Sequence, residues 1–201
     1  MEELERAIEA IRAGKPVLLP TDTVYGLVTT PYRDEPAWRL YKLKGRDPTQ
    51  PTALLAASVE MLFECVPELR GRAGRIARAL LPGRYTLILA NPARRYRWLT
   101  GTRPDAIGVR VPELDGLGRD ILEQAGAVMA TSANRAGGRD PRTVDEVPEE
   151  IRSRCAAVVD GGELPGTPST VIDAVGPEPF VVREGAAPGE EALERIAAAL
   201  S

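Results

Sequence analysis

Short apolar runs alternate along this chain with segments in which apolar residues recur at helical spacing. The run from residue 16 to 20 is bounded by prolines and is most simply a buried strand. It follows a segment in which Leu4, Ile8 and Ile11 would share one helical face, and Gly14 stands where a helix C-cap is expected. Strands that alternate with helices in this way are typical of α/β proteins.

The same patterns predict the elements of the whole chain. Helices are expected over residues 2–13, 34–43 (with Asp34 as its cap), 58–64, 70–80, 117–125, 143–152 and 189–200. Strands are expected over residues 16–20, 52–57, 85–90, 107–111, 127–130, 156–160, 169–174 and 180–183. The last two strands suggest an antiparallel return through Gly176 and Pro177. We therefore expect a single α/β domain over residues 1–201, with a mixed parallel and antiparallel sheet flanked by helices.

The absence of histidine from the 201 residues excludes several kinds of site. A Ser-His-Asp or Cys-His nucleophile, a histidine general base and a histidine metal ligand are all impossible. Cys65 and Cys155 are too far apart in the sequence for a CxxC site, and we expect two buried, unpaired thiols. The GxxxxGK[ST] and GxGxxG fingerprints of nucleotide-binding loops are also absent.

The charge balance and the N-terminus indicate where the protein works. With 26 basic and 29 acidic side chains, the formal charge of −3 gives no global attraction to nucleic acid or to an anionic membrane. The N-terminal segment is acidic and amphipathic, unlike a secretory signal, and no apolar run approaches the roughly 18 residues of a membrane span. We expect a cytoplasmic protein with no membrane partner.

Four polar segments follow predicted elements at places where α/β proteins bind ligands. They cover residues 20–26, 42–48, 130–134 and 168–173. In the first, two threonines flank Asp22, which can serve either a ligand or a capped turn. In the second, Lys44 and Arg46 could clamp successive phosphates, or could meet the dipole at a helix C-terminus.

The third segment, Arg110 and the arginine runs could also bind a ligand. Ser132 and Asn134 lie two apart, so in an extended chain they would point to one side and could hydrogen-bond one ligand. Arg110 lies between valines on a predicted strand and needs an anion, which could be a ligand or an internal carboxylate such as Asp173 or Asp160. Further arginines form either a solvated face or a patch for RNA backbone, and these are Arg70, Arg72, Arg75, Arg78, Arg94, Arg95 and Arg97.

The order of these motifs is more specific than any one of them. Pro-Thr-Asp-Thr-Val-Tyr-Gly-Leu is followed by Lys-x-Arg, Pro-Gly-x-Tyr-Thr-Leu-Ile-Leu, Gly-Val-Arg-Val-Pro, Thr-Ser-Ala-Asn, Ser-Thr-Val-Ile-Asp and Val-Arg-Glu-Gly. This series resembles the YrdC/TsaC family of threonylcarbamoyl-adenylate synthases, from about residue 4 to 198. The resemblance implies a strongly twisted mixed sheet with helices around a concave, positively charged cavity.

The resemblance also implies an activity. Members of the family are nucleotidyltransferases that convert L-threonine, bicarbonate and ATP, with Mg²⁺, to threonylcarbamoyl-AMP and pyrophosphate. Partner proteins then transfer the threonylcarbamoyl group to tRNA, which a member could also bind directly. Threonine's amine and bicarbonate can give an N-carboxylate that attacks the α-phosphate, so no protein nucleophile is required.

The family's site residues can be carried over to matching positions. Lys44, Arg46, Ser132 and Asn134 resemble the nucleotide-binding and catalytic tetrad, and Arg183 resembles a further ATP contact. The threonine pocket would comprise Thr21, Arg110, Ala130 and Ser169. Asp22 and Asp173 are candidates to hold the metal or to orient a cation, and the metal ligands stay open.

Three positions depart from the family's pattern. Asp47 stands where many members have proline, Val28 replaces a common glycine, and Leu55 replaces a histidine that some longer members use near threonine. The chain's length resembles that of the short bacterial form. Two alternatives remain, a paralogue of YciO type with the same fold and an RNA-binding or ribosome-maturation protein that uses the same cavity. The complete Lys-x-Arg and Ser-x-Asn pairs favour the synthase over the paralogue.

Overall fold

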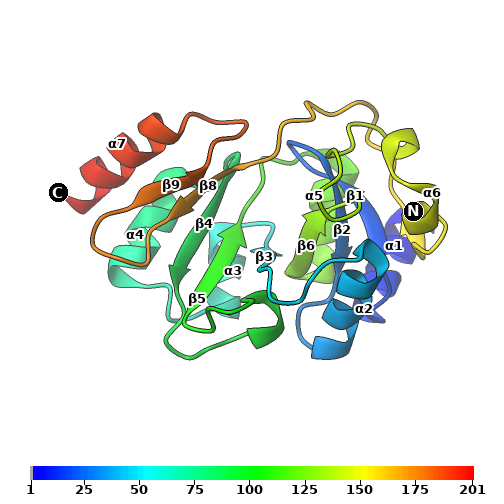
Figure 1. Cartoon of the computed structure of the whole chain (residues 1–201), viewed down its shortest axis with the longest axis horizontal. Coiled ribbons are helices and arrows are strands. Elements are labelled where there is room, and N and C mark those ends of the chain that lie inside the picture. Colours follow the sequence, from blue (N-terminus) through cyan, green and yellow to red (C-terminus); the bar gives the residue numbers. More distant parts are fainter. Residues whose placement is uncertain (1) are drawn as a thin grey trace.

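A single mixed sheet runs through the computed structural model, which describes residues 2–201 (Figure 1). Its nine strands lie in the order β7-β1-β2-β6-β3-β5-β4-β8-β9. The strands are β1 (Val17–Pro20), β2 (Tyr25–Thr29), β3 (Ala53–Leu55), β4 (Tyr85–Ala90), β5 (Ala106–Arg110), β6 (Val128–Ser132), β7 (Ala157–Val158), β8 (Thr170–Asp173) and β9 (Phe180–Arg183). Parallel pairs join β1 to β7, β3 to β5 and β4 to β8, and the other neighbours are antiparallel, so the predicted mixed sheet is confirmed.

Helices cover the sheet in two groups (Figure 1). They are α1 (Glu2–Arg12), α2 (Asp34–Lys44), α3 (Val59–Cys65), α4 (Gly71–Leu80), α5 (Gly116–Ala125), α6 (Glu149–Arg152) and α7 (Gly189–Leu200), with 3₁₀ turns at Arg97–Leu99 and Val144–Glu146. Helices α1 and α5 pack together beside β1, β2 and β6, whereas α4 and α7 pack together beside β4, β8 and β9. None of the helices in the described part of the chain has the length and apolarity that a membrane crossing needs.

Alternation along β1 shows that this part of the sheet is buried on both faces. Leu18 belongs to the larger of two hydrophobic clusters, whereas Val17 and Leu19 belong to the smaller one, against α1 and α5. Successive strand residues point to opposite faces, so an uninterrupted apolar run needs a cover on each side. This is why the short run between two prolines becomes an interior strand.

The sequence analysis missed one strand and misplaced two helix features. Residues 25–29 form a fully buried strand that was not predicted, and the turn of the β1–β2 hairpin is confined to residues 21–24. The expected helix over 143–152 is divided into a 3₁₀ turn and α6, since Pro148 lies between them and caps α6. Asp34 is the first residue of α2 instead of its cap, and the cap residue Arg33 makes no side-chain capping bond.

The structure accounts for both cysteines and for part of the arginine runs. Both cysteines are free and partly buried, and burial raises the pKa of the Cys155 thiol to about 12. Arg78 pairs with Glu60, and Arg95 pairs with Glu68. These ion pairs on the surface favour the solvated-face interpretation for part of the arginine runs.

Candidate active site

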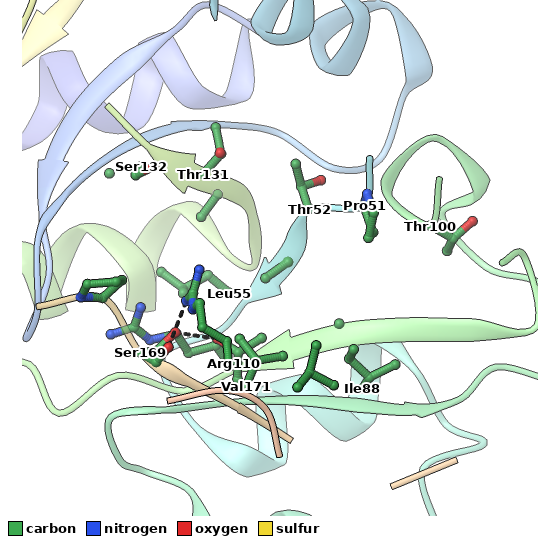
Figure 2. A pocket seen from close by; sticks show the side chains of 18 of the residues that line it. Pro51, Thr52, Leu55, Ile88, Thr100, Arg110, Thr131, Ser132, Ser169 and Val171 are labelled. Atoms are coloured by element: carbon green, nitrogen blue, oxygen red, sulfur yellow. Dashed lines mark hydrogen bonds between the residues drawn. The ribbon is translucent and has the colours of Figure 1, made fainter. Parts of the chain in front are cut away.

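A cavity of about 370 Å³ lies over the middle of the sheet and is lined by residues from both helix-covered groups of strands. Small side chains form much of its floor, including Ala53 and Ala106 beside Gly108. A Cβ on Gly108 would lie 3.3 Å from the Thr52 carbonyl oxygen, so a larger residue would crowd β3. In Figure 2, Arg110 and Ser169 lie close together at one end of the cavity, with Thr100 at the other. The volume is in the range of sites for small ligands.

Seven of the nine predicted site residues line this cavity. They are Thr21, Arg46, Arg110, Ala130, Ser132, Ser169 and Arg183. The other two, Lys44 and Asn134, are buried side chains that contact the wall from behind through Ser132. The structure thus brings together residues that are up to about 160 positions apart in the sequence.

Lys44 is the last residue of α2, and its ammonium group is held by the end of β6. Its Nζ donates to Asn134 Oδ1 at 2.9 Å and to the backbone carbonyl of Ser132. Ser132 Oγ donates to the same Asn134 oxygen at 2.7 Å, and Asn134 Nδ2 donates to Asp140 at 3.1 Å. The sequence suggested that Ser132 and Asn134 point to one side of an extended strand. Strand β6 instead ends at Ser132, and a hydrogen bond joins the two side chains.

Burial gives Lys44 an unusual titration. Loss of solvent and, to a smaller degree, the nearby charge of Arg46 lower the pKa of its ammonium group to about 8, although Asp140 opposes both effects. Arg46 lines the cavity and donates from Nη2 to the Pro51 carbonyl at 2.7 Å, while its buried Nε has no partner among the described residues. Two cations therefore lie close together with few counter-charges, an arrangement that suits a polyanionic ligand.

If ATP binds beside Lys44, its affinity should fall as the pH rises above about 8. The phosphates favour the charged ammonium group, so binding above that pH must take up a proton, and affinity should drop by up to about tenfold per pH unit. Calorimetry at pH 9 in buffers of different ionisation enthalpy should show this uptake, and the uptake should vanish at pH 7. A Lys44→Met variant that still took up the proton would assign it to another group. In the free protein the same shift makes stability rise between pH 8 and 10.5, because only the unfolded chain holds the proton there.

Arg110 has a different partner from those expected. Its Nη2 donates to Asp22 Oδ1 and, at 2.8 Å, to Thr23 Oγ1, and the ion pair to Asp22 is buried. The two carboxylates proposed from the sequence are used elsewhere, since Asp173 accepts from Arg103 at 2.6 Å and Asp160 accepts from the Tyr25 hydroxyl at 3.0 Å. Asp22 and Asp173 thus each orient an arginine, one of the two roles left open for them.

Thr86 is a residue of the cavity that the sequence analysis missed. It lies on β4, and its hydroxyl shares a 2.8 Å hydrogen bond with that of Ser169. Arg183 Nη2 donates to the Ser169 carbonyl at 2.7 Å, so Ser169 is held from two strands. A polar side chain within the apolar run of residues 85–90 was the available signal.

Proteins of similar sequence and structure identify the family. The model of the Sua5/YciO/YrdC family, described as "Telomere recombination", matches residues 9–185. The chain belongs to the Sua5/YciO/YrdC family. The resemblance inferred from the order of the motifs is therefore confirmed.

Individual relatives of this Sua5/YciO/YrdC chain differ in length. A threonylcarbamoyl-AMP synthase of Pyrococcus abyssi is 34% identical over 187 residues, which are 92% of this chain and 54% of that relative. A crystal structure of P. abyssi Sua5 complexed with L-threonine has a TM-score of 0.86 at 32% identity and covers 96% of this chain and 57% of that one. The crystal structure of E. coli YciO has a TM-score of 0.80 at 25% identity, and the match covers 92% of this chain and 90% of YciO. The chain thus spans little more than half of the Pyrococcus protein and most of YciO.

Proposed function

We propose that this protein is an L-threonylcarbamoyladenylate synthase that acts on L-threonine, bicarbonate and ATP. The observation that carries the proposal is the pairing, in one cavity, of a cationic end at Arg46, backed by Lys44, with a buried arginine at Arg110. The first group suits a triphosphate and the second a single carboxylate. The synthase name of the Pyrococcus relative and the threonine bound in its structure support the same assignment.

The proposed reaction has two steps. The threonine amine attacks the carbon of bicarbonate and water leaves, which gives an N-carboxylate. An oxygen of this carboxylate then attacks the α-phosphorus of ATP, and the bond to the β-phosphate oxygen breaks and releases pyrophosphate. In this scheme Lys44 and Arg46 neutralise the phosphates, Ser132 and Asn134 orient the nucleotide, Arg183 contacts it, and Arg110 holds the threonine carboxylate.

Thr21, Ala130 and Ser169 complete the proposed threonine pocket, and each lines the cavity. Leu55 lies in the same lining, where some longer relatives have histidine, so this part of the pocket is apolar. The threonine side chain carries a methyl group that an apolar contact can bury.

Mg²⁺ fits this cavity as an ion that arrives with the nucleotide. Within residues 2–201, no three acidic or cysteine side chains gather in a cluster suited to a metal, and Asp140 is the one carboxylate in the cavity lining. Magnesium is usually held by substrate phosphates with one or two carboxylates and water. Asp140 would hold the ion, which supplies charge neutralisation on the phosphates.

The proposed product implies partners. Threonylcarbamoyl-AMP is an activated intermediate, and partner proteins of the tRNA-modification system would transfer its acyl group to tRNA. This role would place the protein in the cytoplasm, where ATP and tRNA meet.

The assay that tests the proposal supplies ATP, Mg²⁺, labelled bicarbonate and one amino acid at a time, and measures labelled adenylate and pyrophosphate. We expect an adenylate that depends on threonine. If the folded protein forms no labelled adenylate with any amino acid, the synthase assignment is rejected in favour of a paralogue with another activity. ATP-independent and threonine-independent binding of RNA would then point to the RNA-binding alternative.

A further inference from the structure

We propose that Asp22 is a positioning residue that makes the Arg110 subsite selective for a single carboxylate over a phosphate. This inference rests on the proposed function and assigns a role to a side chain that does not line the cavity itself. Asp22 lies behind Arg110, in the turn between β1 and β2. Its side chain is 3% exposed, so it acts on a ligand only through its neighbour.

Asp22 is itself held rigidly. One carboxylate oxygen accepts from Arg110 Nη2, and the other accepts from the backbone N–H of Glu113 at 3.1 Å, in the segment between β5 and α5. Both oxygens are therefore occupied, which makes Asp22 a poor general base and a good anchor. Thr23 fixes the same Nη2 from a second direction, at 2.8 Å.

The anchoring leaves a defined part of the guanidinium group for a ligand. Both intramolecular bonds come from Nη2, whereas Nε is buried with no hydrogen-bond partner among the described residues. Nε is enclosed and the two hydrogens of Nη2 are used, so Nη1 is the donor that remains for a ligand. Since Arg110 lines the cavity and its Nη1 donates to no described residue, the Nη1 donors can bind a carboxylate through charge-assisted hydrogen bonds.

The charge of Asp22 sets which anion fits. Burial lowers the pKa of the Arg110 guanidinium group, Asp22 opposes this, and the charges of Arg183 and Arg84 add to the lowering. Arg183 lines the same cavity, so three positive charges lie near this end of it. Without a counter-charge such a group would attract the phosphates of ATP or pyrophosphate more strongly than a monoanion. The buried carboxylate of Asp22 cancels one of the three charges and is too enclosed to be displaced by solvent.

An Asp22→Asn variant of the full chain separates these effects, because asparagine keeps the size and one acceptor but removes the charge. Calorimetry without ATP should show threonine affinity reduced by about 10- to 100-fold. Added pyrophosphate should leave threonine binding to the wild type unchanged but should compete with threonine in the variant. In the synthase assay the KM for threonine should rise, and the KM for ATP should change far less.

Matched controls make the outcome decisive. Asp115→Asn removes the same charge from an exposed side chain that makes no capping bond, two residues beyond Glu113, and should bind threonine as the wild type does. If Asp22→Asn does not fold, Thr23→Val removes the other acceptor of Nη2 and should raise the threonine KM with little change for ATP. Unchanged threonine binding in the folded Asp22 variant, or in Thr23→Val when the first does not fold, overturns the inference. A wild type that binds no threonine would instead reject the proposed function.

Discussion

Replacing Lys44 with methionine should lower kcat/KM for ATP by about 100- to 1000-fold, the range found when one preorganised charged donor is removed from a site. Methionine fills nearly the same buried volume, and Asn134 Oδ1 keeps its bond from Ser132 Oγ, so the fold should survive. The threonine dissociation constant, measured without ATP, should change little, because Arg110 and its partners are not altered. Steady-state kinetics at pH 7, where Lys44 is charged, gives the comparison.

Lys42 provides the matched control for this experiment. It lies two residues earlier on α2, is exposed and forms no ion pair with the described residues. Lys42→Met changes the net charge equally and should leave kcat/KM for ATP within about twofold. Equal losses in the two variants would mean that general electrostatic attraction, not the buried ammonium group, accounts for nucleotide use.

Replacing Gly101 with alanine should lower the free energy of unfolding by about 2 to 5 kcal/mol, the sum of backbone strain and overpacking. Gly101 has a positive φ of 58°, and a Cβ there would lie 2.2 Å from the Thr49 carbonyl oxygen and 3.0 Å from the Pro51 nitrogen. The glycine therefore lets the segment that carries Thr100 and Thr102 approach the one that carries Pro51 and Thr52, and all four residues line the cavity. Urea denaturation measures the loss, and ATP use should fall with it.

Gly71 provides a control that separates backbone strain from overpacking. Its φ is 56°, nearly the same, but a Cβ there meets nothing within 4 Å. Gly71→Ala should therefore show only the backbone strain, about 1 to 2 kcal/mol. If Gly101→Ala cost no more than Gly71→Ala, the two cavity-lining segments would have room to separate, and the close approach would not be important for stability.

The strands of the sheet were predictable wherever apolar residues formed an uninterrupted run. Val17–Leu19 is the example, since all three side chains are buried and their burial favours an interior strand. Residues 25–29 were not recognised, since Gly26 and Thr29 give a mixed local pattern and the strand is specified by pairing with β1 and β6. Local propensity carries no information about such partners.

In the candidate site, too, residue types were predictable from the sequence, whereas their partners were not. Residue types suggested that Lys44, Arg46 and Arg110 bind anions; the structure places them in or against one cavity, and anion binding there stays a prediction. The partner of Arg110 could not be chosen from sequence, because Asp22, Asp160 and Asp173 all lie at or just beyond the ends of strands, and only the folded sheet brings Asp22 to Nη2. The depressed pKa of Lys44 likewise depends on its burial, which the exposed end of a helix does not suggest.

The order of strands in the sheet also governs when the cavity can exist during synthesis. Strand β2 pairs with β6, about a hundred residues later in the chain, and the lining is completed only by Ser169 on the approach to β8 and by Arg183 at the end of β9. A growing chain on the ribosome can close the β1–β2 hairpin early, yet it has no complete binding site until most of its residues have emerged. The proposed ligands could therefore stabilise only the finished protein, and the early intermediates must rely on local contacts such as those of the β1–β2 hairpin.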